Sequence, residues 1–138
     1  MISEARKGAR ADPGVRAFFA EAMAQDQPLF LSAITIGELR RGVDLIRHRG
    51  DHHQAEILEQ WLTLLLQNYD NRVLALDGEA AQLWGRLRVP HGEPVLDKQI
   101  AAIALLHGLT VVTRNTVDLL STGVALLNPF HAPTELLP

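Results

Sequence analysis

The sequence predicts an α/β fold in which a central parallel sheet is flanked by helices in three layers. Short apolar segments at 29–34, 73–76, 109–113 and 124–127 have the length and boundaries of buried strands. Segments with apolar residues at three- and four-residue spacing lie between most of them, as in amphipathic helices. Strands that alternate with helices are typical of a parallel sheet covered on both faces.

Length and composition favour one domain spanning residues 1–138, because 138 residues with 47% hydrophobic content can bury a core. The absence of cysteine excludes disulfides and thiolate metal sites, and it suits a reducing, cytoplasmic location. The net charge of −3 does not indicate a general affinity for nucleic acid, so any such site must be local. The apolar run 100–112 is shorter than the roughly 20 residues of a membrane span, and the first residues lack the apolar core of a signal peptide.

The first half of the chain contains clear start signals for helices. Asp12 followed by Pro13 predicts a helix that runs to about Gln25. The strand expected at 29–34 is followed by Thr35, and Glu38 lies three residues further on. This spacing predicts a capping box at the start of the next helix.

The second half repeats this alternation. A helix that ends near Asn68 should turn one apolar face inward, and this face consists of Ile57, Leu58, Trp61, Leu62 and Leu65. Asp77 is expected to cap the next helix, which ends before Pro90. A further helix is expected to start at Asp97 and to close at Gly108, where glycine tolerates the left-handed conformation.

Three acidic residues lie just past a strand or near a helix start, namely Glu38, Asp97 and Asp118. Ligands of such sheets bind beyond the carboxyl ends of the strands, so these carboxylates could converge there. Oxygen ligands without cysteine suit a hard cation such as Mg²⁺ or Mn²⁺. Each residue could instead serve only a helix cap or an Asx-turn, and spacing alone leaves this open.

Other site classes lack their local signatures. His48 and His52 are four residues apart, but they lie in a charged, glycine-broken segment without an HExxH pattern. The sequence contains no GxSxG elbow, no GxxxxGK[ST] loop and no GxGxxG turn. Serine hydrolase, P-loop and dinucleotide-binding functions are therefore not indicated.

Four segments together carry a resemblance: ITIGELRRG (34–42), PVLDKQIAA (94–102), TVVTRNTVDL (110–119) and STGVALLNPF (121–130). In this order and spacing they resemble the VapC-type toxins of the PIN-domain ribonuclease family, especially its FitB-like branch. The resemblance covers nearly the whole chain.

The resemblance implies a metal-dependent endoribonuclease that uses Mg²⁺ or Mn²⁺ and forms the toxin half of a toxin–antitoxin pair. It carries the metal ligands over to Glu38, Asp97 and Asp118, and it gives positioning roles to Thr113 and Asn115. Candidates for binding RNA phosphates are Arg40, Arg41 and Arg114, since guanidinium groups match phosphate geometry. A small antitoxin protein and a second copy of the chain are the implied partners.

The opening MISEARKG departs from the family pattern, in which a short central strand with a fourth acid precedes the Ile-Ser-Glu segment. We expect that translation starts upstream of Met1. If the short form is genuine, neighbouring strands are left unpaired and metal binding weakens. A non-catalytic module that binds an antitoxin or RNA is then the rival function, and a metal-dependent phosphatase is a third possibility.

Overall fold

The computed structural model describes residues 1–130, so the predicted end of the domain at 131–138 lies outside the described residues. The α-helices are α1 (Ile2–Ala5), α2 (Pro13–Ala24), α3 (Ala33–His48), α4 (His52–Asn68), α5 (Gly78–Leu87) and α6 (Val95–His107). Two 3-10 helices are η1 (Gly8–Arg10) and η2 (Val117–Thr122). The strands are β1 (Leu31–Ser32), β2 (Val73–Leu74), β3 (Val111–Val112) and β4 (Leu126–Leu127). Within residues 1–130, none of the helices is long and apolar enough to span a membrane.

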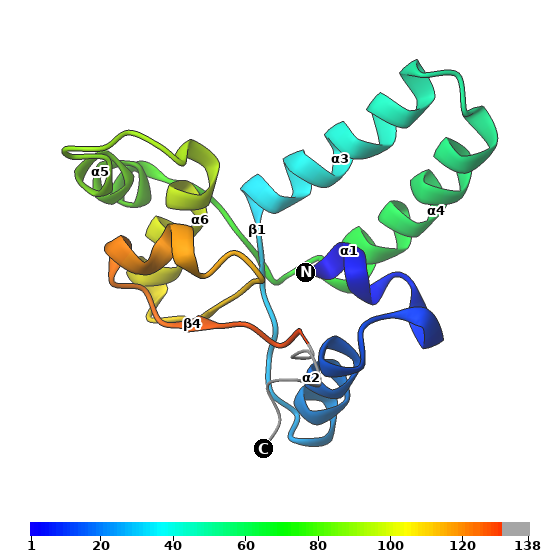
Figure 1. Ribbon diagram of the computed structural model, residues 1–138, viewed down its shortest axis with the longest axis horizontal. Coiled ribbons are helices and arrows are strands. Elements are labelled where there is room, and N and C mark those ends of the chain that lie inside the picture. Colours follow the sequence, from blue (N-terminus) through cyan, green and yellow to red (C-terminus); the bar gives the residue numbers. More distant parts are fainter. Residues whose placement is uncertain (131–138) are drawn as a thin grey trace.

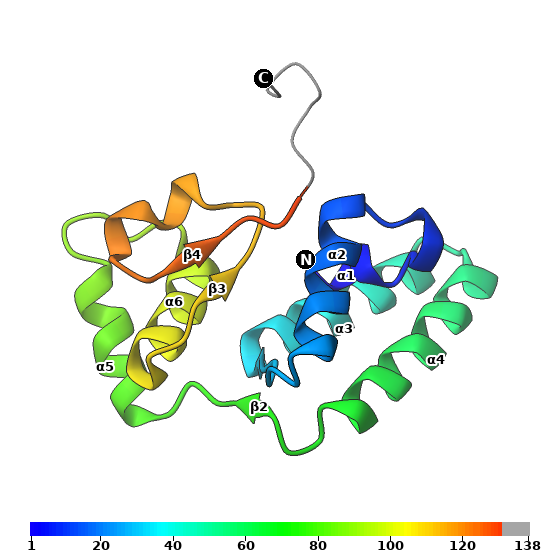
Figure 2. The same cartoon turned by 90° about the horizontal axis from the view of Figure 1, so that it is seen from below.

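The elements form two groups that lie side by side (Figures 1 and 2). The helices α1 to α4 make one group, while α5, α6, η2, β3 and β4 make the other. In Figure 2 the segment that contains β2 leads from α4 to α5 and so connects the groups. The α3–α4 hairpin is the most extended part of the first group in Figure 1.

The strands pair in parallel, as predicted for an α/β fold. Leu31 of β1 is in register with Val73 of β2, and Val111 of β3 is in register with Leu126 of β4. Among the described residues these pairs are two separate two-stranded sheets rather than one hydrogen-bonded sheet. Each strand therefore has a single strand partner, and β1 and β3 are not bonded to each other.

Two hydrophobic cores correspond to these two sheets. The first core lies between β1, α3 and α4, and its buried members are Leu31, Val43, Leu58, Leu62, Leu65 and Tyr69. The second lies around α6, β3 and η2, and its buried members are Ala101, Ala104, Val111, Leu119 and Val124. Burial of apolar surface is the main stabilising contribution to folding, so each group has its own source of stability.

A cavity of about 860 Å³ lies where the two cores meet. Its walls include residues 29–32 around β1 and residues 109–113 around β3. Consecutive residues of a strand direct their backbone N–H groups to opposite edges, so an edge strand leaves polar groups without a strand partner. The cavity thus borders β1 and β3, each of which pairs, within the described residues, with a strand on one side only.

Three helix-end predictions are confirmed. The carboxylate of Asp12 accepts hydrogen bonds from backbone N–H groups at the start of α2, at 2.8 Å for Gly14. Asp77 caps α5 through a 2.9 Å bond from the N–H of Ala80. Gly108 closes α6 with a φ of 65°, a conformation that glycine adopts at little cost.

Two predicted boundaries and one buried position are wrong. The strand predicted at 29–34 ends at Ser32. The hydroxyl of Ser32 accepts the N–H of Thr35 at 3.0 Å and caps α3. The predicted capping box of Thr35 and Glu38 therefore does not form. Ser32 competes successfully because it has the same capping chemistry three residues earlier. The helix expected to start at Asp97 begins two residues earlier, and Ile57, expected inward, is 47% exposed.

Candidate functional site

Asp97, Thr113 and Asn115 are joined by hydrogen bonds. Asp97 lies in the first turn of α6, where the helix dipole favours a negative charge. The side-chain amide of Asn115 donates a 2.7 Å bond to Oδ2 of Asp97. The backbone N–H of Asn115 donates to Oγ1 of Thr113 at 3.0 Å, which shapes the turn that follows β3. Residues 18 positions apart are therefore held together at the end of a strand.

Glu38 lies on α3 across the same cavity. Glu38, Asp97 and Thr113 all line the cavity, together with the hydroxyl-bearing Ser32 and Thr35 at the start of α3. Ser32 Oγ and Thr35 Oγ1 are 3.0 Å apart and bonded to each other. The end of β1 and the end of β3 thus supply polar groups to one space whose other walls are largely apolar.

Asp118 does not join this arrangement in the part of the chain that is described. It is an exposed residue in the first turn of η2 and is absent from the cavity lining. Across residues 1–130, no group of three or more histidine, aspartate or glutamate side chains is close enough together to hold a metal ion. The three predicted carboxylates are therefore not gathered into one cluster.

The oxygen donors at the cavity are of the kind that binds a hard cation. Carboxylate and hydroxyl oxygens are suitable ligands for Mg²⁺ or Mn²⁺, and Glu38 and Asp97 provide two carboxylates on one cavity. Mg²⁺ is often held by one or two carboxylates, with water and substrate phosphate completing its shell. Asp97 and Glu38 are thus the residues that could hold such an ion. Glu21 also lines the cavity, but no three acidic or histidine side chains of residues 1–130 are grouped closely enough to hold a metal ion.

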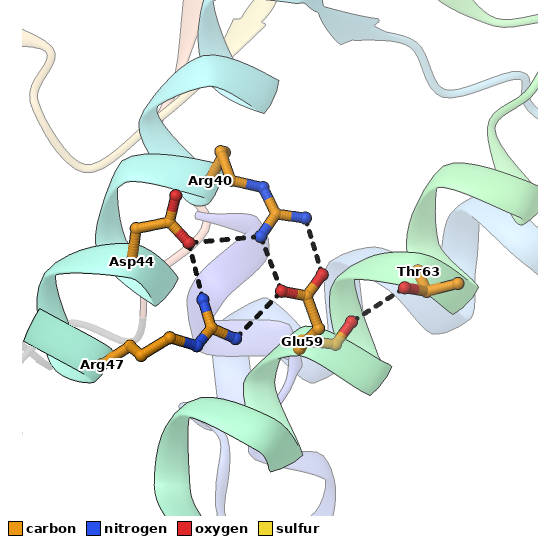
Figure 3. A network of polar contacts seen from close by, with 5 residues as sticks. All are labelled: Arg40, Asp44, Arg47, Glu59 and Thr63. Carbon is orange, nitrogen blue, oxygen red and sulfur yellow. Dashed lines mark hydrogen bonds and ion pairs between the residues drawn. The ribbon is translucent and has the colours of Figure 1, made fainter. Parts of the chain in front are cut away.

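The three candidate RNA-binding arginines differ in their surroundings. Figure 3 shows Arg40 bound to Glu59 of α4, at 2.7 Å for each of two hydrogen bonds, with Asp44 and Arg47 completing the network. Glu59 raises the pKa of Arg40 above its usual value, chiefly through this bond. Arg41 is exposed on α3, and Arg114 lies over the ring of Phe130.

The amino-terminal residues also border the cavity. Met1, Ile2 and Ser3 line it, and burial lowers the pKa of the Met1 amino group. Glu4 has two partners: its carboxylate accepts a bond from Lys7 Nζ at 2.9 Å and another from the backbone N–H of Asp12 at 2.9 Å. The bond from Lys7 is the main reason that the pKa of Glu4 is lowered.

Two residues near the site were not found from the sequence. Lys98 follows Asp97 and is buried, with Nζ donating to the carbonyl of His91 at 2.6 Å. A lysine within the apolar run of α6 is the only signal that could have drawn attention to it. Phe130 contacts Arg114 from 16 positions away, and no local pattern encodes such a pairing.

Comparisons with known proteins identify relatives of this chain. The model of the PIN domain family matches residues 10–121. Toxin FitB of Neisseria gonorrhoeae is 36% identical over 111 residues, which cover 76% of this chain and 78% of that protein. The plasmid stability protein StbB of Pseudomonas syringae pv. tomato is 34% identical over 111 residues, which cover 77% and 78%.

Solved structures are similar over almost the whole length. The crystal structure of FitAcB from Neisseria gonorrhoeae has a TM-score of 0.79 and 32% identity, with 95% of this chain and 94% of that chain covered. The structure of FitAB bound to an IR36 DNA fragment has a TM-score of 0.79 and 30% identity, with 96% and 92% covered. Proteins of this kind are generally nucleases that depend on a divalent metal. From sequence and fold together, this chain belongs to the PIN domain family.

Proposed function

We propose that this chain is a Mg²⁺- or Mn²⁺-dependent endoribonuclease and the toxin component of a type II toxin–antitoxin pair. The observation that carries the proposal is the position of Asp97, which lines the cavity with Glu38 and Thr113 and accepts a bond from Asn115. Similarity to a toxin over three quarters of the chain supports the same conclusion. RNA is the proposed substrate.

Each residue has a proposed role in hydrolysis of the phosphodiester. Asp97 and Glu38 are the proposed metal ligands at the cavity, and Asp118 is a third ligand that would have to approach them. Asn115 orients the Asp97 carboxylate, while Thr113 fixes the turn that carries Asn115. The cation, when bound, supplies an activated water and a positive charge beside the phosphate, so no covalent nucleophile is required.

The direct test is cleavage of RNA by the full chain with Mn²⁺ and with EDTA. We expect cleavage only with metal, and we expect Asp97→Asn to abolish it while circular dichroism shows an unchanged fold. Glu56→Gln is the matched control, because Glu56 is exposed on α4 and absent from the cavity lining. Metal-independent cleavage, or full activity in Asp97→Asn, would contradict the proposal.

A second candidate function is a non-catalytic module that binds RNA or an antitoxin without cleavage. It is favoured by the exposed position of Asp118 away from the other two carboxylates in the described part of the chain. Binding of RNA without cleavage under all metal conditions would support this candidate. Turnover of small phosphate esters but not RNA would instead support a phosphatase.

The proposed partners follow from the relatives. One similar structure is of FitAB bound to a DNA fragment, which supports an assembly of the chain with a second protein. We propose a small antitoxin, a homodimer of this chain and a cytoplasmic location. Co-expression with the product of the adjacent gene, followed by mass measurement of the purified complex, tests the first two.

A further inference from the structure

Phe130 holds the guanidinium of Arg114. The guanidinium carbon lies 3.8 Å from the centroid of the Phe130 ring, whereas the other cation–ring contacts in residues 1–130 range from 4.6 to 6.0 Å. A cation at this distance over an aromatic face is attracted by the ring quadrupole. The backbone N–H of Phe130 donates to Oδ1 of Asn128 at 3.0 Å, so a local turn fixes the chain that carries the ring.

This contact connects the segments that follow two neighbouring strands. Val112 of β3 and Leu127 of β4 are in parallel register, so the chain leaves both strands at the same end of the sheet. Arg114 comes two residues after β3, and Phe130 comes three residues after β4. The contact therefore spans the end of the sheet where Asn115 meets Asp97.

The charge of Arg114 is available to a ligand. Arg114 takes part in none of the ion pairs of the described chain, whereas Arg40 and Arg47 are both bound to Asp44 and Glu59. The donors of a guanidinium lie in its plane, and a ring stacked on its face leaves them free for a phosphate. Arg114 directly follows Thr113, which lines the cavity.

We infer that Phe130 is a positioning residue that holds Arg114 beyond the carboxyl ends of β3 and β4, where the guanidinium binds an RNA phosphate. The inference rests on the proposed ribonuclease function and extends it to a residue outside the set predicted from the sequence. Phe130 itself touches no substrate in this arrangement. Its effect passes through Arg114 alone, which makes the two residues one unit.

The test measures binding of the full chain to a fluorescein-labelled single-stranded RNA oligonucleotide in EDTA, so that cleavage does not interfere. We expect Arg114→Ala to weaken binding. The slope of the logarithm of the binding constant against the logarithm of salt concentration should also fall by about the amount of one phosphate contact. Phe130→Leu removes the ring but keeps an apolar side chain, and we expect it to weaken binding about two- to fivefold. Phe130→Tyr keeps the ring and should bind as the wild type does.

The double variant and a matched control make the test specific. Arg114→Ala combined with Phe130→Leu should bind no more weakly than Arg114→Ala alone, because the two residues act as one. Arg88→Ala is the control: it also removes one charge from a ring contact, 4.7 Å from Trp84, but that contact lies at the end of α5 and not beyond the ends of β3 and β4. In a cleavage assay with metal, Phe130→Leu should raise KM and leave kcat unchanged.

The outcomes separate this inference from the function on which it rests. If the wild type neither binds RNA in EDTA nor cleaves it with Mn²⁺, the proposed function and the inference both fail. If it cleaves RNA with Mn²⁺ but does not bind it in EDTA, only the inference fails. Two outcomes overturn only the inference, provided that the wild type binds RNA and Arg114→Ala weakens that binding. In the first, Phe130→Leu binds RNA as tightly as the wild type. In the second, the double variant binds RNA more weakly than Arg114→Ala alone.

Discussion

Arg40 and Glu59 form a bidentate ion pair that joins α3 to α4. Both hydrogen bonds measure 2.7 Å, and Arg47 reaches the same carboxylate at 3.1 Å. These contacts connect residues 19 and 12 positions apart across the hairpin in Figure 3. The pairing uses the donors of Arg40 within the protein, so of the three predicted RNA-binding arginines it is the least available to a phosphate.

The ion pair predicts a dependence of stability on acid pH. The hydrogen bond from Arg40 lowers the pKa of Glu59 from 4.5 to about 2. A carboxylate with a lowered folded-state pKa contributes stability that is present above its unfolded pKa and is lost as the pH falls toward the folded value. We expect the difference in Tm between the wild type and Glu59→Gln to be largest above pH 4.5 and to shrink toward pH 2.

The salt dependence and a second variant test whether the Tm difference is electrostatic. The pair is solvent-accessible, so high ionic strength should reduce the difference as well. Glu56→Gln, on the same helix and in no ion pair of the described residues, should give a difference from the wild type that changes little over this range. A Glu59→Gln effect that is independent of pH would rule out the electrostatic explanation.

The cap of α3 predicts a measurable loss of stability. Ser32→Ala removes the oxygen that accepts the N–H of Thr35, and loss of such a cap costs roughly 1 kcal/mol. Ser32→Asp keeps an acceptor and should retain most of the stability. Ser121→Ala, at an exposed position of η2, is the control and should not change the urea midpoint. Equal midpoints for Ser32→Ala and wild type would show that Ser32 does not stabilise the helix.

The two leucines Leu62 and Leu64 of α4 allow a test of the first core. Leu62 is fully buried and Leu64 is 60% exposed on the same helix. Truncating a buried leucine leaves a cavity and costs about 2–5 kcal/mol, so Leu62→Ala should strongly lower the free energy of unfolding. Leu64→Ala should change it by no more than about 0.5 kcal/mol. Similar losses from both variants in urea unfolding would contradict the assigned burial.

Local signals predicted the helix ends well because the stabilising atoms are close in sequence. Asp12 and Asp77 cap helices with N–H groups two or three residues away, and Gly108 ends α6 through its own backbone conformation. The capping box of Thr35 failed because Ser32 offered an equivalent cap three residues earlier. Sequence alone could not rank two caps of the same chemistry.

The candidate site was partly predictable from the order of strands and helices. Asp97, Thr113 and Asn115 come together because each follows or faces the end of β3, and that relationship follows from the order of strands and helices. The separation of Asp118 depends on the path of η2 after the turn, which no spacing rule specifies. The contact of Phe130 with Arg114 depends on the register of β3 with β4, so it appears only in three dimensions.

The bond from Asn115 to Asp97 predicts a loss of activity when the amide is removed. Asn115→Ala leaves the carboxylate of Asp97 without the donor that orients it at 2.7 Å. Partners that orient metal-ligating groups typically contribute about 10–100-fold to activity or metal affinity, so we expect kcat/KM for RNA cleavage to fall by that factor. Isothermal titration with Mn²⁺ should show weaker binding as well, because the carboxylate must then be ordered at the moment of binding. Asn71→Ala, at an exposed position before β2, is the matched control and should behave as the wild type does. Unchanged cleavage and unchanged Mn²⁺ affinity in Asn115→Ala would show that the bond does not position Asp97 for function.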